Sequence, residues 1–136
     1  MVSTLFVVAD QSRAQLYRVK GSRVAPTLEE VDLLDHEVEA SANKSGSHHS
    51  LSFFDSKGPV DEEQRRFVRR LVERLRQGQQ SGEFRRLYIA APANFVGKIR
   101  GLYGSALAST VEREIIGDYT GQDRNKLEAR MARWLS

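Results

Sequence analysis

Apolar residues in the first third of the chain form three short runs with the spacing of β-strands. Leu5–Ala9 is continuously apolar, which is typical of a strand buried on both faces. Arg13–Lys20 alternates along its length and predicts a half-exposed strand. Leu28–Leu34 predicts a third strand, less clearly. Because the connections between these runs are short, we expect the three strands to form an antiparallel meander.

The stretch 86–103 predicts the centre of the fold. Leu87–Ala91 is an apolar run that stops at Pro92, and it has the character of a buried strand. The residues that follow predict a helix, because apolar side chains recur there at helical spacing: Phe95, Val96, Ile99, Leu102 and Tyr103. Gly97, Gly101 and Gly104 weaken such a helix unless something packs closely against them. A central strand that runs directly into a helix is the basic step of an α/β layered fold.

A longer helix is predicted between the meander and the central strand. Pro59 suits its first turn, and Asp61, Glu62 and Glu63 complement the positive end of the helix dipole. Its apolar stripe consists of Val60, Phe67, Val68, Leu71, Val72 and Leu75. We expect the segment Gly78–Gly82 to end this helix.

The last part of the chain completes the order of elements. Val111–Ile116 predicts a fifth strand, and Thr120–Asp123 has a capping-box pattern that begins a final helix. We interpret the apolar stripe of that helix as core: Leu127, Met131, Trp134 and Leu135. The order β-β-β-α-β-α-β-α predicts an α/β protein, namely a single ribonuclease-H-like domain over residues 1–136. Its mixed five-stranded sheet would carry helices on both faces.

The composition limits the possible chemistry. The chain has 136 residues, enough to build one domain with a proper core, and it has no Cys. Disulfides, thiolate metal sites and Cys nucleophiles are therefore excluded. The N-terminal segment has no basic leader, and no run approaches the roughly 18 apolar residues that span a bilayer. We expect a cytoplasmic protein with no membrane partner.

Residues 41–58 are predicted to form a long polar loop that is rich in Ser, Asn, Gly, His and Lys. A loop of this length in a compact domain is either functional or disordered. We expect Gly46, His48 and His49 to form its functional tip. Phe53 and Phe54 have two readings: they cap the core of the domain, or they insert into a partner or a second subunit.

Candidate catalytic and metal-binding groups are incomplete. Asp10 and Asp118 follow the first and fifth predicted strands, where carboxylates could hold Mg²⁺. The central strand ends without an acid, so we predict no metal site. His36, His48 and His49 match no usual spacing of zinc ligands. Nucleophile-elbow and phosphate-loop motifs are absent, so we predict no cofactor and find no complete catalytic constellation.

Basic residues are concentrated between Arg65 and Arg86, in a chain of net charge +3 and pI ≈ 9.4. One side of the long helix carries a set of residues that we call the arginine face: Arg65, Arg66, Arg69, Arg70 and Arg74. Lys98 and Arg100 add to the local positive charge. Guanidinium groups suit phosphate because their planar fork donates two parallel hydrogen bonds. The arginine face therefore predicts contact with RNA or another polyanion.

The alternative is an arginine face that is merely solvated. Pairs such as Glu62–Arg66 and Glu73–Arg76 would then stabilise the helix surface. Acids are few in this part of the sequence, so pairing of this kind leaves most of the arginines without a partner.

Several segments, taken in order, resemble the bacterial host attachment protein family. They are ADQSRAQLY at 9–17, FDS at 54–56, the acidic-then-Arg helix start at 61–70, LYIAAP at 87–92 with FVG at 95–97, and VEREIIGDY at 111–119. No segment is specific by itself, but together their order and spacing cover essentially the whole chain.

The resemblance implies a domain similar to the central domain of archaeal and eukaryotic class-one release factors. In those factors a Gly-Gly-Gln loop positions water for the hydrolysis of peptidyl-tRNA. The corresponding loop here contains Gly46 but no Gly-Gly and no Gln, so the resemblance does not carry catalysis over to this chain. Contact between the arginine face and tRNA or the ribosome remains open.

These observations favour a non-catalytic, RNA- or ribosome-associated binding domain that uses the arginine face. One alternative is a hydrolase that acts on peptidyl-tRNA or an ester through Ser and His residues of the 41–58 loop. Another is a protein-interaction module that uses Phe53 and Phe54, with a homodimer as one form of that interaction.

Overall fold

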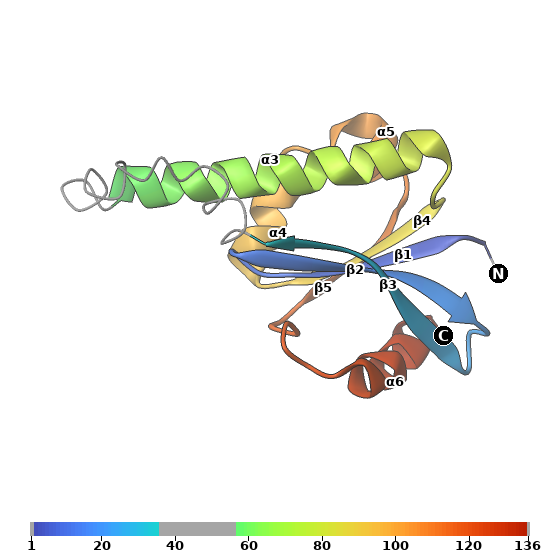
Figure 1. The fold of residues 1–136 in the computed structure, drawn as a ribbon. Coiled ribbons are helices and arrows are strands. Elements are labelled where there is room, and N and C mark those ends of the chain that lie inside the picture. Colours follow the sequence, from blue (N-terminus) through green and yellow to red (C-terminus); the bar gives the residue numbers. More distant parts are fainter. Residues whose placement is uncertain (1, 36–56, 136) are drawn as a thin grey trace.

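The computed structural model describes residues 2–35 and 57–135, with side chains from residue 62 onward in the second range. All five predicted strands are present in the expected order (Figure 1). The elements are β1 (Thr4–Ala9), β2 (Arg13–Gly21), β3 (Pro26–Asp35), α3 (Lys57–Ser81), β4 (Arg86–Ala91), α4 (Ala93–Arg100), α5 (Gly104–Ala108), β5 (Val111–Ile116) and α6 (Arg124–Leu135).

The strands form one five-stranded sheet in the order β3-β2-β1-β4-β5. The first three strands are antiparallel neighbours, as the predicted meander requires. β1 pairs in parallel with β4, and β4 pairs in parallel with β5, so the sheet is mixed. All six residues of β1 are buried, because this strand lies in the middle of the sheet and is covered on both faces.

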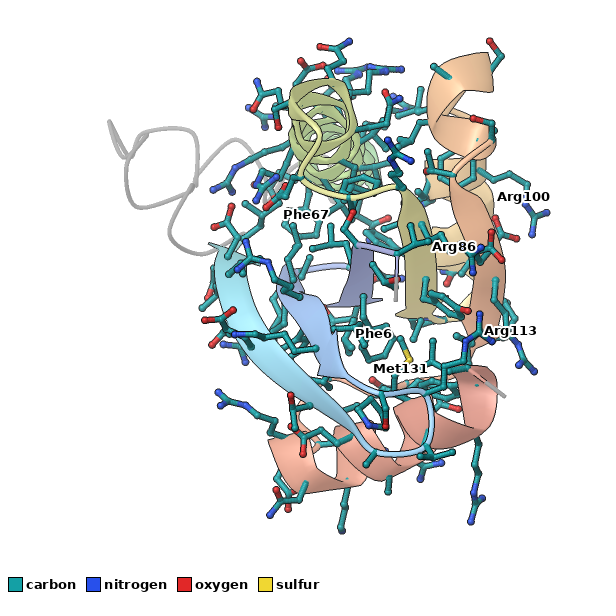
Figure 2. All side chains as sticks on the ribbon, turned by 90° about the vertical axis from the view of Figure 1, so that its right-hand side faces the viewer. Phe6, Phe67, Arg86, Arg100, Arg113 and Met131 are labelled. Carbon is teal, nitrogen blue, oxygen red and sulfur yellow. The ribbon has the colours of Figure 1, made fainter. Side chains whose placement is uncertain are left out.

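Helices cover both faces of the sheet, with α3, α4 and α5 on one face and α6 on the other (Figure 1). Leu5 and Val7 belong to the core on the α3 face, whereas Phe6 belongs to the core under α6, because successive strand residues point to opposite sides. Figure 2 shows Phe67 and Met131 on opposite sides of the sheet. The predicted α/β class and mixed sheet are confirmed, and the ribonuclease-H-like label stays a prediction.

α3 continues through Gly78 and ends at Ser81, which corrects one part of the predicted helix end. The Glu83 N–H donates to the Gly78 carbonyl at 2.8 Å, and the Gly82 N–H donates to the Gln79 carbonyl at 3.3 Å. These two bonds form a Schellman motif, in which Gly82 supplies the left-handed residue with a φ of 83°. Gly78 has a different role: a Cβ there would lie 2.9 Å from Phe84, so glycine allows close packing.

The single helix predicted after the central strand is in fact two helices, α4 and α5. Gly104 begins α5 in the left-handed region, with a φ of 75°. Outside its own helix backbone and chain neighbours, no described atom lies within 4 Å of a Cβ built at Gly97, so no close packing offsets the cost of this glycine in α4. Tyr103 is buried, but Leu102, expected in the apolar stripe, is 38% exposed.

α6 begins later than the capping-box pattern predicts. Asp123 Oδ1 accepts a hydrogen bond from the Lys126 N–H at 2.9 Å, so Asp123 caps the helix and Thr120 does not. The ring of Trp134 lies 5.7 Å from that of Phe6, measured between centroids. The apolar stripe of α6 packs on the sheet as predicted, with three buried members: Leu127, Met131 and Leu135.

Candidate nucleic-acid interface

α3 separates an apolar side from a basic side. Its buried side chains, which include Phe67 and Leu71, pack on the sheet at helical spacing. The opposite side presents Arg65, Arg66 and Arg69 to solvent. The amphipathic spacing thus places these arginines in solvent, and their charges are not buried in the core.

The exposed arginines differ in their partners. Arg65 Nη1 lies 3.3 Å from Glu62 Oε1, an exposed i,i+3 pair of the kind that contributes little in water. Among the described side chains, those of residues 2–35 and 62–135, neither Arg66 nor Arg69 has an ion-pair or side-chain hydrogen-bond partner. The predicted pairing of Glu62 with Arg66 is therefore replaced by pairing with Arg65. Two guanidinium groups keep their donors available for an external anion.

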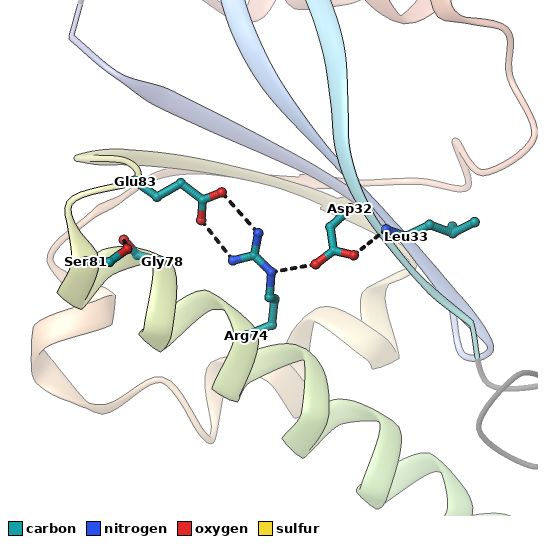
Figure 3. Close-up of polar contacts among 6 residues, drawn as sticks. All are labelled: Asp32, Leu33, Arg74, Gly78, Ser81 and Glu83. Atoms are coloured by element: carbon teal, nitrogen blue, oxygen red, sulfur yellow. Dashed lines mark hydrogen bonds and ion pairs between the residues drawn. The ribbon is translucent and has the colours of Figure 1, made fainter. Parts of the chain in front are cut away.

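Arg74 is held inside a three-residue ion-pair network (Figure 3). Its Nε donates to Asp32 Oδ2 at 2.6 Å, and its two terminal nitrogens donate to the Glu83 carboxylate at 2.8 and 3.0 Å. The Arg74 side chain is only 21% exposed. This guanidinium therefore joins β3 to the end of α3, and most of its donors are occupied.

Both carboxylates of this network are ionised at neutral pH. Burial raises the pKa of Asp32, but hydrogen bonds from Arg74 and from the Leu33 N–H outweigh it, so the pKa lies below its ordinary value. Hydrogen bonds from Arg74 lower the pKa of Glu83 as well. The charge of Arg74 is thus balanced inside the protein. Arg70 also contacts the protein, because its Nη1 donates to the Asp35 carbonyl at 3.5 Å.

A groove lies between α3 and the connection from α4 to α5. Its first hollow has a volume of about 350 Å³ and is lined by Arg65, Val68, Arg69, Lys98 and Leu102. A second hollow of about 490 Å³ is lined by Arg69, Arg70, Val72, Glu73, Arg76 and Leu102. Because the hollows share Arg69 and Leu102, we describe them together as the α3 groove.

Lys98 brings a positive charge from α4 to the α3 groove. Its Nζ donates to Gln64 Oε1 at 2.6 Å, and Gln64 Nε2 donates to Gln11 Oε1 at 3.2 Å. These contacts fix Lys98 against α3 and the β1–β2 turn. Arg100, the other cation considered beside the arginine face, instead pairs with Glu114 of β5. Sequence reasoning missed Leu102 as a groove residue, because its helical spacing indicated core.

The two candidate carboxylates at the ends of β1 and β5 have a structural arrangement. Asp10 Oδ1 accepts hydrogen bonds from the N–H groups of Ser12 and Arg13 at 2.8 and 2.9 Å, which closes the β1–β2 turn. Thr120 Oγ1 lies 2.9 Å from Asp10 Oδ2 and 2.9 Å from Asp118 Oδ1. Burial raises the pKa of Asp10, but these hydrogen bonds outweigh it and lower the pKa. No group of three or more His, Asp or Glu that could hold a metal occurs among the described residues.

Other predicted site residues lie outside the described ranges. These are the loop residues Gly46, His48 and His49 and the two phenylalanines Phe53 and Phe54. The hydrolase and protein-interaction readings depend on them, and no described contact favours either reading. Among the described helices, none has the length and apolar character to cross a bilayer.

The described residues define an α/β protein with a mixed sheet, helices on both faces and a basic groove along its longest helix. The family model described as "Protein required for attachment to host cells" matches residues 5–131. The chain therefore belongs to that family, and the resemblance seen in the sequence is confirmed. Among curated proteins, none matches this sequence.

Two solved archaeal structures are similar to this one. The first is the translation termination factor aRF1, with 15% identity and a TM-score of 0.49 over 96% of this chain and 37% of that chain. The second is described as an archaeal protein, with 15% identity and a TM-score of 0.50 over 96% of this chain and 36% of that chain. At such identity the likeness concerns the fold alone, and this chain spans little more than a third of either structure.

Proposed function

We propose that this protein is a non-catalytic RNA-binding domain that contacts phosphates with the α3 groove and the arginines beside it. The observation that carries this proposal is the state of Arg66 and Arg69. Both are exposed, and neither has an acidic partner within the described part of the chain. Unpaired guanidinium groups on one helix face are the expected features of a phosphate-binding surface.

The proposed site is smaller than the arginine face. Arg65 and Arg69 of α3 and Lys98 of α4 line the α3 groove, and we add the exposed Arg66, which follows Arg65 on α3. Arg74 is left out because Asp32 and Glu83 occupy its donors, and Arg70 is left out because it contacts the Asp35 carbonyl. The remaining cations bring about four positive charges to one surface, enough to neutralise several phosphates.

We propose tRNA or the ribosome as the partner and the cytoplasm as the location. The family resemblance to the central domain of release factors supports this choice of first probes. The 41–58 loop has no Gly-Gly-Gln sequence of the kind that positions water in the release factors, which supports binding without hydrolysis. A binding domain of this kind would recognise phosphate geometry more than base sequence.

The first test measures binding of bulk tRNA and of ribosomes to the purified protein across a salt series. Neutralisation of about four phosphates should give a log–log slope of about −3 to −4. A slope near zero, or no binding at low salt, would overturn the proposal.

Charge reversal locates the site. We expect the variant Arg65→Glu, Arg66→Glu, Arg69→Glu to lose at least about tenfold in RNA affinity while it stays folded, because these side chains lie off the apolar stripe. The matched control is Arg124→Glu, Lys126→Glu, Arg130→Glu, which gives the same net charge but changes α6 on the opposite face of the sheet. Equal losses in the two variants would show that total charge, rather than the α3 groove, drives binding.

A further inference from the structure

The α3 groove combines cations with an apolar floor. Leu102 lines both hollows and is among the few large apolar side chains of the described residues with more than a third of their surface exposed. Val68 and Val72 lie beneath the hollows and are almost wholly buried, so Leu102 supplies the exposed apolar surface of the groove. Leu102 holds apolar surface in water beside the cations, and a ligand with an apolar part would gain free energy by covering it.

The position of Leu102 is fixed by its backbone. Leu102 lies in the short connection between α4 and α5, where its N–H donates to the Ile99 carbonyl at 2.9 Å. Arg76 Nη2 donates to the Leu102 carbonyl at 2.7 Å and ties this connection to α3. The neighbouring Tyr103 is buried and anchors the same segment in the core. These contacts therefore hold Leu102 in one place at the groove.

Cations and floor are close enough to act on one ligand. Arg65 and Lys98 share the first hollow with Leu102, and Arg69 lies at the junction of both hollows. A nucleotide has a charged phosphate on one side and a flat apolar base on the other. An arginine can both bind the phosphate and stack its guanidinium plane on a base.

We propose that the α3 groove accepts an unpaired base of single-stranded RNA, with the base against Leu102 and its phosphate on Arg65, Arg69 and Lys98. This inference rests on the proposed function and narrows its ligand. A duplex keeps its bases stacked inside and presents phosphates and sugars, so it would cover Leu102 without an apolar partner. An unpaired base buries the leucine and leaves its phosphate within reach of the cations.

The test compares a short unstructured oligoribonucleotide with the duplex formed by the same strand and its complement. We expect the wild-type protein to bind the single strand about tenfold more tightly at the same salt concentration. Leu102→Asn should remove most of this preference, since it takes away the apolar contact but adds no charge. Leu33→Asn is the matched control, because Leu33 is also exposed, at 43%, and lies outside the groove.

Each outcome has a distinct meaning. Equal binding of both probes, with loss of both in the Arg65, Arg66 and Arg69 triple variant, would overturn this inference and leave the proposed function intact. Absence of binding by either probe would overturn both. If Leu102→Asn did not fold, the wild-type preference between the two probes would still decide the question.

Discussion

Arg74 donates hydrogen bonds to two carboxylates that come from different parts of the chain. Asp32 belongs to β3, whereas Glu83 follows the end of α3. Removal of the cation would leave two ionised carboxylates without their donor. We expect Arg74→Met to lower the free energy of unfolding by about 2 kcal/mol, measured by urea denaturation at neutral pH. Arg66→Met, on the exposed side of the same helix, should change it little.

Acid pH provides a check on the Arg74 prediction. The folded state lowers the pKa of Asp32 and Glu83, so their stabilising effect is present above about pH 4 and is lost as pH falls through the folded pKa values. The difference in unfolding free energy between wild type and Arg74→Met should therefore shrink in acid. A difference that stays constant over this pH range would argue against an ionic role for Arg74.

At the residue scale, the sequence predicts the charge but not its partners. The excess of arginine over acid was visible in the stretch from Arg65 to Arg86. The pairing of Arg74 with Asp32 could not be predicted, because it forms only when α3 packs on the sheet that contains β3. The exposure of Leu102 could not be predicted either. Its spacing matched one continuous helix, whereas the structure has two helices, α4 and α5, with Leu102 between them.

At the element scale, three glycines within or at the end of helices have different roles. Gly82 ends α3 in the left-handed region, Gly78 lies in a close contact inside α3, and Gly97 lies exposed inside α4. The strands β1 and β4 were easier to predict than these helix ends, since each is a continuous apolar run. A glycine gives no such pattern, and its role depends on the atoms that surround its missing Cβ.

The glycines give a paired prediction. Gly97→Ala should raise the free energy of unfolding by about 0.5–1 kcal/mol, because α4 gains helix propensity and the new methyl group meets no described atom. Gly78→Ala should lower it by about 1–3 kcal/mol, because its Cβ would collide with the Glu83 carboxylate and the Phe84 ring. Thermal unfolding of the two variants measures both changes. Stabilisation by Gly78→Ala would show that the end of α3 adjusts freely.

At the scale of the whole molecule, β1 and α6 bring distant parts of the chain into one core. Phe6 and Trp134 are in ring contact, and Tyr119 packs edge-on against the same indole at 5.4 Å. This contact supports our proposal that residues 1–136 form a single domain. The sequence predicted the class of fold from the order of its elements, but apolar patterns alone do not reveal which strands become neighbours.

Cooperative unfolding tests the single-domain proposal. The chain has one Trp, which reports on the α6 side, while far-UV circular dichroism reports mainly on the 25-residue helix α3 on the other side. Because the two layers share one sheet, we expect both signals to give the same urea midpoint. Met131→Ala should lower both midpoints together, since it opens a cavity under α6. Separate transitions would show two independently stable layers.

The central position of β1 has a consequence during protein synthesis. β1 and β2 are made one after the other and can pair at once, but the other edge of β1 has no partner until β4 is made. In that interval the nascent chain exposes an unpaired strand edge between two apolar faces, which favours association with other chains. The time needed to translate from Ala9 to Ala91 therefore sets how long this edge of β1 stays without its partner strand.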